Sequence, residues 1–167
     1  MTFAEPSRYL KVDVASQTLE VIEGGAVVKT YPVSTARNGV GELNGSGCTP
    51  RGWHVIRAKI GGGQPLNAVF VGRRPTGEVY TEELGRAHPE RDWIVTRILW
   101  LGGLEPGLNR YGQVDTGQRY IYIHGSPDSG VNGQPLSHGC IRMRSMDVAE
   151  LFELLPVGCR VLVAEAD

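Results

Sequence analysis

The sequence predicts a mainly β protein, a sandwich or meander of mixed sheets with one clear helix and irregular lid loops. Three observations support this fold class. Short apolar runs alternate with polar residues at strand period, 23 glycines mostly mark turns, and only one segment clearly has apolar residues at helical spacing. With 167 residues and 41% hydrophobic content, the chain can form one domain with a core, so we expect a single domain over residues 1–167.

The amino-terminal part predicts a β-meander. Residues 10–14 alternate apolar and polar side chains, a turn follows at positions 16–17, and residues 18–22 return along the first strand. Two glycines at positions 24–25 then turn the chain into a third strand over residues 26–31. Three strands joined by short turns are therefore expected side by side.

The middle of the chain predicts strands separated by long loops. Residues 53–60, 68–71 and 94–101 are strand candidates, and the last is apolar enough to be central. The stretch 72–112 is the least regular, with a short helix expected around residues 81–85. Loops on a rigid sheet commonly form the walls or lid of a site, so this stretch is expected to do so.

The one clear helix lies near the carboxyl terminus. Ser145 is its predicted N-cap, Asp147 suits its first turn, and Pro156 and Gly158 end it. A closing strand is expected over residues 159–163. The apolar residues that repeat at helical spacing are Val148, Leu151, Phe152 and Leu155.

The charge balance narrows the class of partner. The chain has 17 basic and 18 acidic residues and is nearly neutral, without the excess of charge that would suggest nucleic acid or a membrane surface. It also has no uninterrupted apolar segment near the 18 residues that a membrane span needs. We therefore expect small-molecule partners, with no nucleic acid and no membrane.

The amino terminus and the cysteines predict a cytoplasmic location. Residues 1–6 have neither the basic start nor the apolar core of a signal peptide, and Tyr9 already begins a predicted strand. Three cysteines without a repeating spacing do not predict a disulfide framework and suit a reducing compartment. A fragment that had lost its leader would show the same pattern, and would belong in the periplasm.

Residues 137–142 read Ser-His-Gly-Cys-Ile-Arg, and a His-Gly pair begins sixteen residues before the cysteine. A catalytic thiol needs a base, positive surroundings and free backbone N–H groups for an oxyanion. Cys140, His124, His138 and Gly139 can supply all three. Gly139 also lets the backbone approach a reacting carbonyl, since it has no Cβ. The motif therefore predicts a nucleophilic cysteine.

The spacing predicts which histidine is the base. Residues 120–123 are β-branched and aromatic and predict a strand with His124 at its end, and residues 126–136 predict a loop. The returning chain can then lay Cys140 beside that strand end. His138 would share a face with Cys140 in an extended segment, with Cα atoms roughly 6.5 Å apart. We therefore assign His124 as the base, and His138 to substrate contact or charge stabilisation.

The motif resembles the active site of the L,D-transpeptidase catalytic domain, also called the YkuD domain. Residues 124–126 and 137–142 carry the closest likeness. Residues 9–22 resemble the family's opening strand, turn and strand, residues 31–35 its following strand, and residues 49–52 its Thr-Pro-x-Gly element. Together these segments span most of the chain.

This resemblance implies a reaction on peptidoglycan stem peptides that needs no cofactor. Cys140 would attack the carbonyl at the L-centre of the third stem residue, release the terminal D-alanine and leave a thioester. His124 would accept the proton while the carbonyl of Gly125 holds its ring, and the N–H groups of Gly139 and Cys140 would bind the oxyanion. Carbapenems, which react with this family's cysteine, are expected to be covalent inhibitors.

The acyl acceptor decides between two activities. An amine gives a cross-link or an exchanged D-amino acid, whereas water gives an L,D-carboxypeptidase. The predicted cytoplasmic location favours a murein tetrapeptide L,D-carboxypeptidase of peptidoglycan recycling, a branch of the family that the chain resembles. A transpeptidase is the alternative if an export leader is missing. A non-catalytic muropeptide-binding module is a third possibility, against which Cys140, both motif histidines and Arg142 argue.

Several residues are assigned to substrate binding. Arg142 matches a family position often occupied by arginine and would orient the loop or bind substrate carboxylates. Ser137 and Gly125, which belong to the motif, are placed with it. A carboxypeptidase must recognise a free terminal carboxylate, so we expect one further arginine at the site, the alternative being solvated surface charge. The candidates are Arg73, Arg74 and Arg110.

The histidines and cysteines also allow other interpretations. A metal site could be built from His124, His138 and Cys140, but zinc sites in short chains usually show paired ligands such as Cys-x-x-Cys, and the sequence has none. We therefore expect no metal. Cys159 alternates with valines on a predicted strand and is assigned to the core, and Cys48 is assigned as an incidental thiol.

Overall fold

The computed structural model describes residues 5–165, and its ten strands form one sheet. The strand order is β4-β10-β1-β2-β3-β9-β8-β7-β5-β6, and β4 also pairs with β7. That additional pairing closes the sheet into a barrel-like sandwich, which confirms the mainly β fold class. The strands are β1 (Arg8–Asp13), β2 (Thr18–Glu23), β3 (Ala26–Ser34), β4 (Gly52–Ile60), β5 (Ala68–Val71), β6 (Arg74–Val79), β7 (Ile94–Gly103), β8 (Tyr122–Ser126), β9 (Ile141–Arg144) and β10 (Arg160–Ala164).

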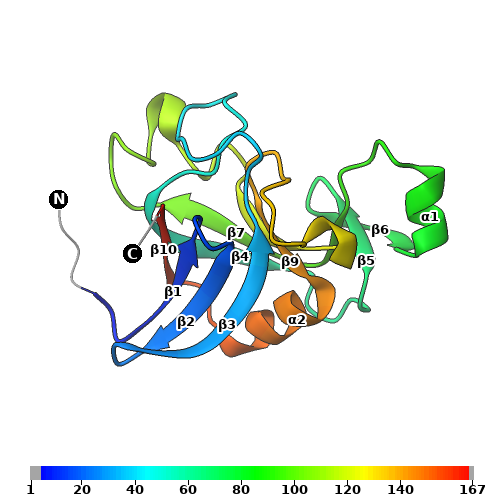
Figure 1. Cartoon of the computed structure of the whole chain (residues 1–167), viewed down its shortest axis with the longest axis horizontal. Helices are drawn as coiled ribbons and strands as arrows, with labels where there is room; N and C mark the ends of the chain where they lie inside the picture. Colours follow the sequence, from blue (N-terminus) through cyan, green and yellow to red (C-terminus); the bar gives the residue numbers. More distant parts are fainter. Residues whose placement is uncertain (1–4, 166–167) are drawn as a thin grey trace.

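The two helices differ in how they contact the sheet. Helix α2 (Ser145–Leu154) packs against β7, β8 and β9, whereas α1 (Glu82–Ala87) follows the β5–β6 hairpin at one end of the molecule (Figure 1). Two short 3₁₀ turns cover residues 112–114 and 128–130. Within residues 5–165, no helix has the length and apolar character required to cross a membrane.

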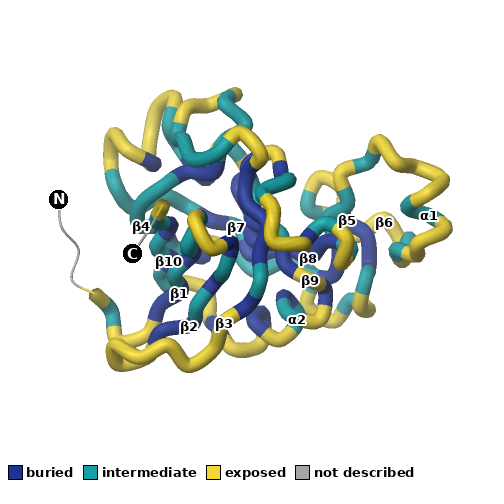
Figure 2. The backbone as a smooth tube through the Cα atoms, viewed as in Figure 1, coloured by how far each residue is buried: buried dark blue, intermediate teal, exposed yellow. Residues whose placement is uncertain are grey.

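The core lies inside the closed sheet and under α2 (Figure 2). Strand alternation builds it, because every second residue of β7 points inward: Leu99 and Leu101 are fully buried there. Burial of each such side chain stabilises the fold by about 1.5–3 kcal/mol. Cys159 is buried in the same core, where the alternation placed it. The opposite faces of these strands remain free to build a site.

The strand that carries His124 differs from the prediction. Tyr120 has a positive φ of 56° and lies in a turn, so β8 begins only at Tyr122 and continues to Ser126. His124 is therefore the third of five strand residues and does not terminate the strand. The strand begins two residues later than the aromatic and β-branched run predicts, because Tyr120 is exposed and belongs to the preceding turn.

The start of α2 is a second correction. Arg144 occupies the N-cap position without a capping side chain, and Ser145 is the first helical residue. The Ser145 hydroxyl instead donates to Asn67 Oδ1 at 2.6 Å and lies 2.7 Å from Thr96 Oγ1. A tertiary hydrogen bond therefore replaces the local cap, a choice that helix-start rules do not anticipate.

Two strands were not predicted. β6 contains Pro75 and Gly77, which weaken any strand signal, and it pairs only with β5 at the edge of the sheet. β9 has four residues and directly follows the reactive motif, so its sequence was interpreted for chemistry and not for structure. The short helix expected nearby is present as α1, with Thr81 accepting a hydrogen bond from the Leu84 N–H as its cap.

Candidate active site

Parallel pairing of β8 with β9 assembles the reactive motif. The register places His124 opposite Arg142 and Ile123 opposite Ile141. Cys140 immediately precedes β9, level with Tyr122, and the Tyr122 N–H donates to its sulfur at 3.3 Å. Because residues two apart on a strand share a face, Tyr122 and His124 present their side chains on the same side of β8. The thiol and the imidazole are thus brought together by the register.

The thiol of Cys140 lies in a protected environment. Its sulfur accepts from the Tyr122 N–H and is 3.6 Å from the Tyr120 carbonyl, to which the S–H donates. Burial raises the pKa of Cys140 to about 11, while the Tyr122 N–H and the charge of Arg142 act in the opposite direction. At neutral pH the resting group is therefore a thiol, and attack requires a base that removes its proton.

His124 has the geometry of that base. Its side chain is buried, and Nδ1 lies 2.7 Å from the carbonyl oxygen of Gly125. A carbonyl only accepts, so Nδ1 carries the proton and Nε2 keeps a free lone pair. Burial lowers the pKa of His124 below its ordinary value, which keeps the imidazole neutral at pH 7. The resting pair is therefore a neutral thiol and a neutral imidazole.

Gly125 is required by packing as well as by this hydrogen bond. It pairs with Val95 across β7 and β8, and a Cβ at this position would collide with the Val95 carbonyl oxygen and approach Val148 to 3.1 Å. The absence of a Cβ at Gly125 thus lets β7 pair closely with β8 beside the carbonyl that fixes His124. The Gly125 carbonyl holds the His124 ring, as the family resemblance implied, whereas its placement among the substrate-binding residues stays a prediction.

Two side chains fix the loop that carries the nucleophile. The Ser137 hydroxyl donates to the Cys140 carbonyl at 2.5 Å and accepts from the Gly139 N–H at 3.2 Å. Thr49 Oγ1 donates to the Gly139 carbonyl at 2.9 Å. Ser137 is buried and turned into the loop, where it makes these contacts. The Gly139 N–H must leave Ser137 before it can bind an oxyanion.

The residues before the thiol are not extended. Gly139 has a φ of 134°, a region that side chains other than glycine rarely adopt, and residues 138–140 form a bend. His138 is exposed on this bend. The same-face relation expected between His138 and Cys140 for an extended segment therefore does not apply. An exposed imidazole beside the nucleophile remains available to substrate.

The sequence predicts Arg142 and one of three further arginines at the site, and the structure brings Arg142 and Arg73 toward it. Arg142 lies opposite His124 and forms an ion pair with Asp92 at 3.2 Å. Arg73 Nη1 donates to Tyr122 Oη at 3.1 Å, and its guanidinium lies 4.9 Å from the Trp100 ring centroid. Both therefore flank the thiol.

The other two arginines lie elsewhere. Arg74 is exposed on the edge strand β6. Arg110 stacks on Tyr111 at 4.7 Å and lines a separate cavity beside β4. Neither has a contact with Cys140, His124 or the loop between them. Sequence position within an irregular stretch could not separate these residues from Arg73.

Sequence reasoning missed two charged residues. Asp92 pairs with Arg142, and its charge favours the imidazolium form of His124 and disfavours the thiolate of Cys140. Arg119 lies under the catalytic loop, where its guanidinium donates to the carbonyls of Cys48 at 2.7 Å and Glu42 at 3.2 Å. No local motif marks either residue, because both reach the site through tertiary folding.

The backbone of Cys48 contributes to this arrangement. Its carbonyl would lie 3.3 Å from a Cβ at position 139, so it packs directly against Gly139. The thiol of Cys48 lies 3.6 Å from the Asn38 carbonyl. Cys48 therefore supports the loop through its main chain, a contact that an incidental thiol in a glycine-rich segment did not suggest.

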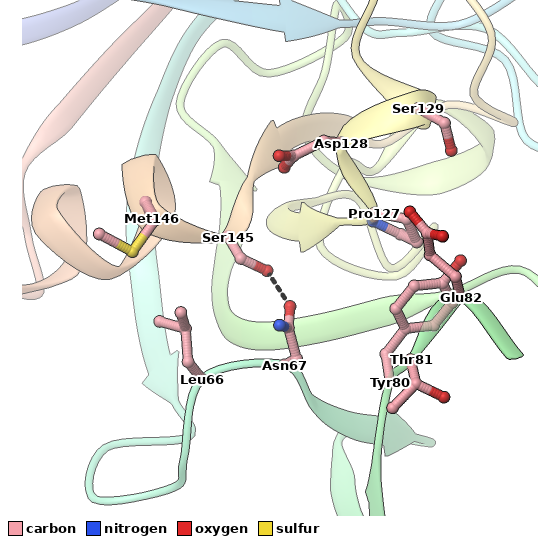
Figure 3. A pocket seen from close by; sticks show the side chains of 10 residues that line it. All are labelled: Leu66, Asn67, Tyr80, Thr81, Glu82, Pro127, Asp128, Ser129, Ser145 and Met146. Carbon is pink, nitrogen blue, oxygen red and sulfur yellow. Dashed lines mark hydrogen bonds between the residues drawn. The ribbon is translucent and has the colours of Figure 1, made fainter. Parts of the chain in front are cut away.

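A cavity of about 390 Å³ lies away from the reactive motif. It is walled by the segment before β5 and the start of α1 on one side, and by the start of α2 and the 127–129 loop on the other (Figure 3). Asn67 and Ser145 meet at its base through their hydrogen bond. No wall residue belongs to the reactive motif, so the candidate site is assigned by its chemistry and not by cavity size.

Residues 5–165 contain no group of three or more His, Cys, Asp or Glu side chains placed to hold a metal ion. The arrangement of Cys140 and His124 is instead that of a nucleophile and its general base, with a carbonyl to orient the base. What it can do chemically is acyl transfer through a thioester.

The chain is similar to known proteins of one family. A family profile, the L,D-transpeptidase catalytic domain (YkuD), matches residues 7–163. The Bacillus subtilis protein named as L,D-transpeptidase YkuD is 25% identical over 156 residues, covering 93% of this chain and 65% of that protein. Another B. subtilis protein, named as L,D-transpeptidase YqjB, is 42% identical over 50 residues, 30% of this chain and 28% of its own length. The chain thus spans less than two thirds of these relatives.

Solved structures share the fold. An L,D-transpeptidase from Xylanimonas cellulosilytica has a TM-score of 0.62 at 19% identity, covering 96% of this chain and 62% of that one. L,D-transpeptidase 3 from Mycobacterium tuberculosis, solved with a faropenem-derived adduct, has a TM-score of 0.56 at 17% identity, covering 96% and 61%. At these identities the likeness concerns the fold.

Proposed function

Because the chain belongs to the L,D-transpeptidase catalytic domain (YkuD) family, we propose that it is a cysteine-dependent L,D-carboxypeptidase that trims peptidoglycan stem tetrapeptides. The family resemblance drawn from the motif is confirmed by the profile match. The coarser statement, an L,D-transpeptidase family enzyme, follows from membership. The choice of water as acceptor and of the tetrapeptide as substrate is our proposal.

The proposed reaction begins with a proton transfer. His124 Nε2 takes the thiol proton as Cys140 Sγ attacks the carbonyl of the third stem residue, and a tetrahedral oxyanion forms. The Gly139 N–H, released from Ser137, and the Cys140 N–H stabilise that charge. The C–N bond then breaks, His124 returns the proton to the leaving D-alanine amine, and a thioester remains on Cys140.

A second round of the same chemistry releases the product. Water gives a proton to His124 and attacks the thioester carbonyl, and the thiolate leaves and takes the proton back. The products are a tripeptide carboxylate and free D-alanine. His124 is suited to both rounds because its pKa lies below the ordinary value and it returns to the neutral base after each one.

The observation that carries the choice of water is the charge around the thiol. Arg142 and Arg119 act on Cys140 with positive charge, and Arg73 contacts Tyr122 beside it. Asp92, which pairs with Arg142, is the opposing negative charge. Positive surroundings attract a substrate with a free terminal carboxylate and disfavour the approach of the ammonium group that an amine acceptor carries at neutral pH. We assign the terminal carboxylate to Arg73, which reaches Tyr122 beside the thiol. Water carries no charge and is not excluded.

The cellular location follows from the same proposal. Cys48, Cys140 and Cys159 are all free thiols in the structure, which suits a reducing compartment. We therefore place the activity in the cytoplasm, on stem peptides recovered from the wall. Cell fractionation with an antibody to the untagged protein tests this: recovery in the periplasmic fraction would contradict it and favour a transpeptidase.

One assay separates hydrolysis from transpeptidation. Purified protein is incubated with free tetrapeptide and increasing D-methionine, and the products are followed by mass spectrometry with Cys140→Ala as control. Tripeptide at all D-methionine concentrations supports the carboxypeptidase. Conversion to a D-methionine-exchanged tetrapeptide would establish a transpeptidase instead, and no turnover despite peptide binding would favour a muropeptide-binding module.

A further inference from the structure

Three aromatic side chains surround the Arg73 guanidinium beside the thiol. Its Cζ lies 4.9 Å from the Trp100 ring centroid and 4.8 Å from that of Tyr120, and its Nη1 donates to Tyr122 Oη at 3.1 Å. The Trp100 and Tyr120 rings are tilted by 44° with centroids 5.8 Å apart, so the guanidinium lies against both. Arg73 is therefore held by two ring contacts and one hydrogen bond.

Arg73 occupies an unfavourable backbone conformation. It follows Gly72 in the two-residue turn between β5 and β6, and both residues have a positive φ, 56° for Gly72 and 65° for Arg73. Turns of this kind favour Asn-Gly or Gly-Gly, because a Cβ is disfavoured in the left-handed region. Such strain persists where surrounding contacts impose it, and it is concentrated at functional sites. The turn thus places a long cationic side chain where local preference would select a glycine.

The charge of Arg73 has no counter-ion in the part of the chain that the structure describes. Within residues 5–165, the arginines in ion pairs are Arg8, Arg51, Arg86, Arg91 and Arg142. Tyr122 Oη accepts from one of the five guanidinium N–H groups of Arg73. A guanidinium that stacks on aromatic rings keeps its in-plane N–H groups for other partners. These groups can form paired hydrogen bonds to a carboxylate.

Tyr120 and Tyr122 also hold the nucleophile through their main chains. The Tyr120 carbonyl accepts from the Cys140 S–H at 3.6 Å, and the Tyr122 N–H donates to the sulfur at 3.3 Å. The same two residues therefore contact both the thiol and the Arg73 guanidinium. The terminal carboxylate of a tetrapeptide lies one residue beyond the carbonyl that Cys140 attacks, and an extended residue spans at most about 3.6 Å. A receptor for this carboxylate must lie beside the thiol, where Arg73 is.

We propose that Tyr120 and Trp100 are positioning residues, which hold the Arg73 guanidinium ready for the terminal carboxylate of the substrate and so set the preference for a free carboxylate. The inference rests on the proposed function for its substrate. Because the two rings have already ordered the long side chain of Arg73, little of its freedom is lost when the carboxylate binds. A terminal carboxamide lacks the negative charge and should gain little from the ordered guanidinium.

Tyr120 is the better of the two positioning residues for a test. Trp100 also stacks on Arg57 at 4.3 Å and packs in the same small apolar cluster as Cys140, so its replacement would disturb several contacts. Tyr120 is 52% exposed, and its ring lies against Arg73 and Trp100. Tyr111 offers a matched control, because it is also exposed, has a positive φ of 71° and lies against an arginine outside the site.

The test measures binding in a Cys140→Ala background, where no peptide is cleaved. Calorimetry gives the dissociation constants of a stem tetrapeptide that ends in D-alanine and of one that ends in D-alaninamide, and their ratio reports the preference for a carboxylate. We expect a ratio of about tenfold or more, which Arg73→Gln should abolish. Tyr120→Leu should lower the ratio about threefold, since ordering one long side chain on binding costs about two- to tenfold in affinity. Tyr120→Phe, which keeps the ring, and Tyr111→Leu should leave the ratio unchanged.

Each outcome decides the proposal. A ratio near one before any further substitution, or an unchanged ratio in Arg73→Gln, would show that Arg73 is not the receptor and would overturn the proposal. Equal weakening of both peptides by Tyr120→Leu would mean a merely structural role, and a lowered ratio in Tyr120→Phe would assign the effect to the hydroxyl; either result overturns it too. Turnover with Cys140 intact is measured separately. Exchange with D-methionine in place of hydrolysis would refute the carboxypeptidase and leave the positioning role supported.

Discussion

The two faces of the paired strands β8 and β9 differ in function, since one packs in the core and the other carries the reactive residues. On one face Ile123 and Ile141 are fully buried in the core. On the other, His124 and Arg142 form the next register pair and carry the chemistry. The alternation of a strand thus makes adjacent residues serve folding and reaction independently. Apolar contacts tolerate exchange at a cost in stability, whereas the reactive face depends on single atoms.

The largest expected effect on activity is that of Cys140→Ala, which changes only the reactive face. Removing the nucleophile should lower kcat/KM for tetrapeptide by about 10⁴-fold or more, because no other thiol has a paired base. The substitution removes only the sulfur and leaves the Cβ in its packing, so the melting temperature should stay within about 2 °C. Steady-state assays with thermal unfolding of the same preparation measure both. Retained turnover would show that Cys140 is not the nucleophile.

Ile123→Ala tests the core-facing side of the same strands. This side chain is fully buried in the core cluster to which residues of β7 and α2 also belong, and its loss should lower the free energy of unfolding by about 2–5 kcal/mol. Urea denaturation measures that loss. The folded fraction should keep kcat within about threefold, since the reactive face is untouched. A large loss of kcat in fully folded protein would mean that the two faces are coupled.

Much of this arrangement could be predicted from local sequence. The meander, most strand segments and the helix follow from alternation, glycine turns and helical spacing. Cys140 and His124 were singled out because a thiol and an upstream imidazole in small-residue contexts have few other uses. These features are encoded within a few neighbouring residues, where propensity and motif both act.

What escaped prediction depends on long-range contacts. Asp92 meets Arg142 from 50 residues away, and Arg119 reaches Cys48 from 71 residues away. The Ser145 hydroxyl donates a hydrogen bond to Asn67 and does not cap the helix as predicted. No local pattern specifies such pairings, because they exist only after the sheet has closed.

The pH dependence of Cys140 alkylation sharpens the contrast between a buried and an ordinary thiol. Because burial raises its pKa to about 11, from an ordinary value near 9, the thiolate fraction at pH 7 should be lowered about 100-fold. Iodoacetamide labelling of Cys140, resolved by peptide mass mapping, should keep rising up to about pH 11. A plateau below pH 8 would indicate a preformed thiolate.

The decline of kcat/KM at acidic pH reports on the protonation of His124. Its folded pKa is lowered by burial, so the neutral base persists as the pH falls through the ordinary range near 6.5. The value of kcat/KM should therefore begin to decline only below about pH 6.5. Carbapenem acylation of Cys140, followed as a mass increase, should show the same limb, and Cys140→Ala should show no adduct. A decline that begins above pH 7 would contradict a neutral resting imidazole.

The smallest expected effect is that of replacing Arg119, which lies beneath the loop of residues 137–140. Arg119 is half-buried, and its guanidinium donates to the Cys48 carbonyl that packs on Gly139. Its charge acts on Cys140 against the dominant effect of burial and lowers the thiol pKa. Arg119→Gln should reduce kcat/KM about tenfold and shift the alkylation profile to higher pH, since it removes both the charge and the hydrogen bonds.

Arg119→Lys separates these two contributions. Lysine keeps the charge but cannot bridge several carbonyls with a planar fork, so the alkylation profile should stay near that of the parent while kcat falls. Arg86→Gln, on the exposed surface of α1, is the control for loss of a charge alone. If glutamine and lysine lower kcat equally and neither moves the alkylation profile, Arg119 acts only by holding the loop, and the thiol takes its electrostatic environment from Asp92 and Arg142.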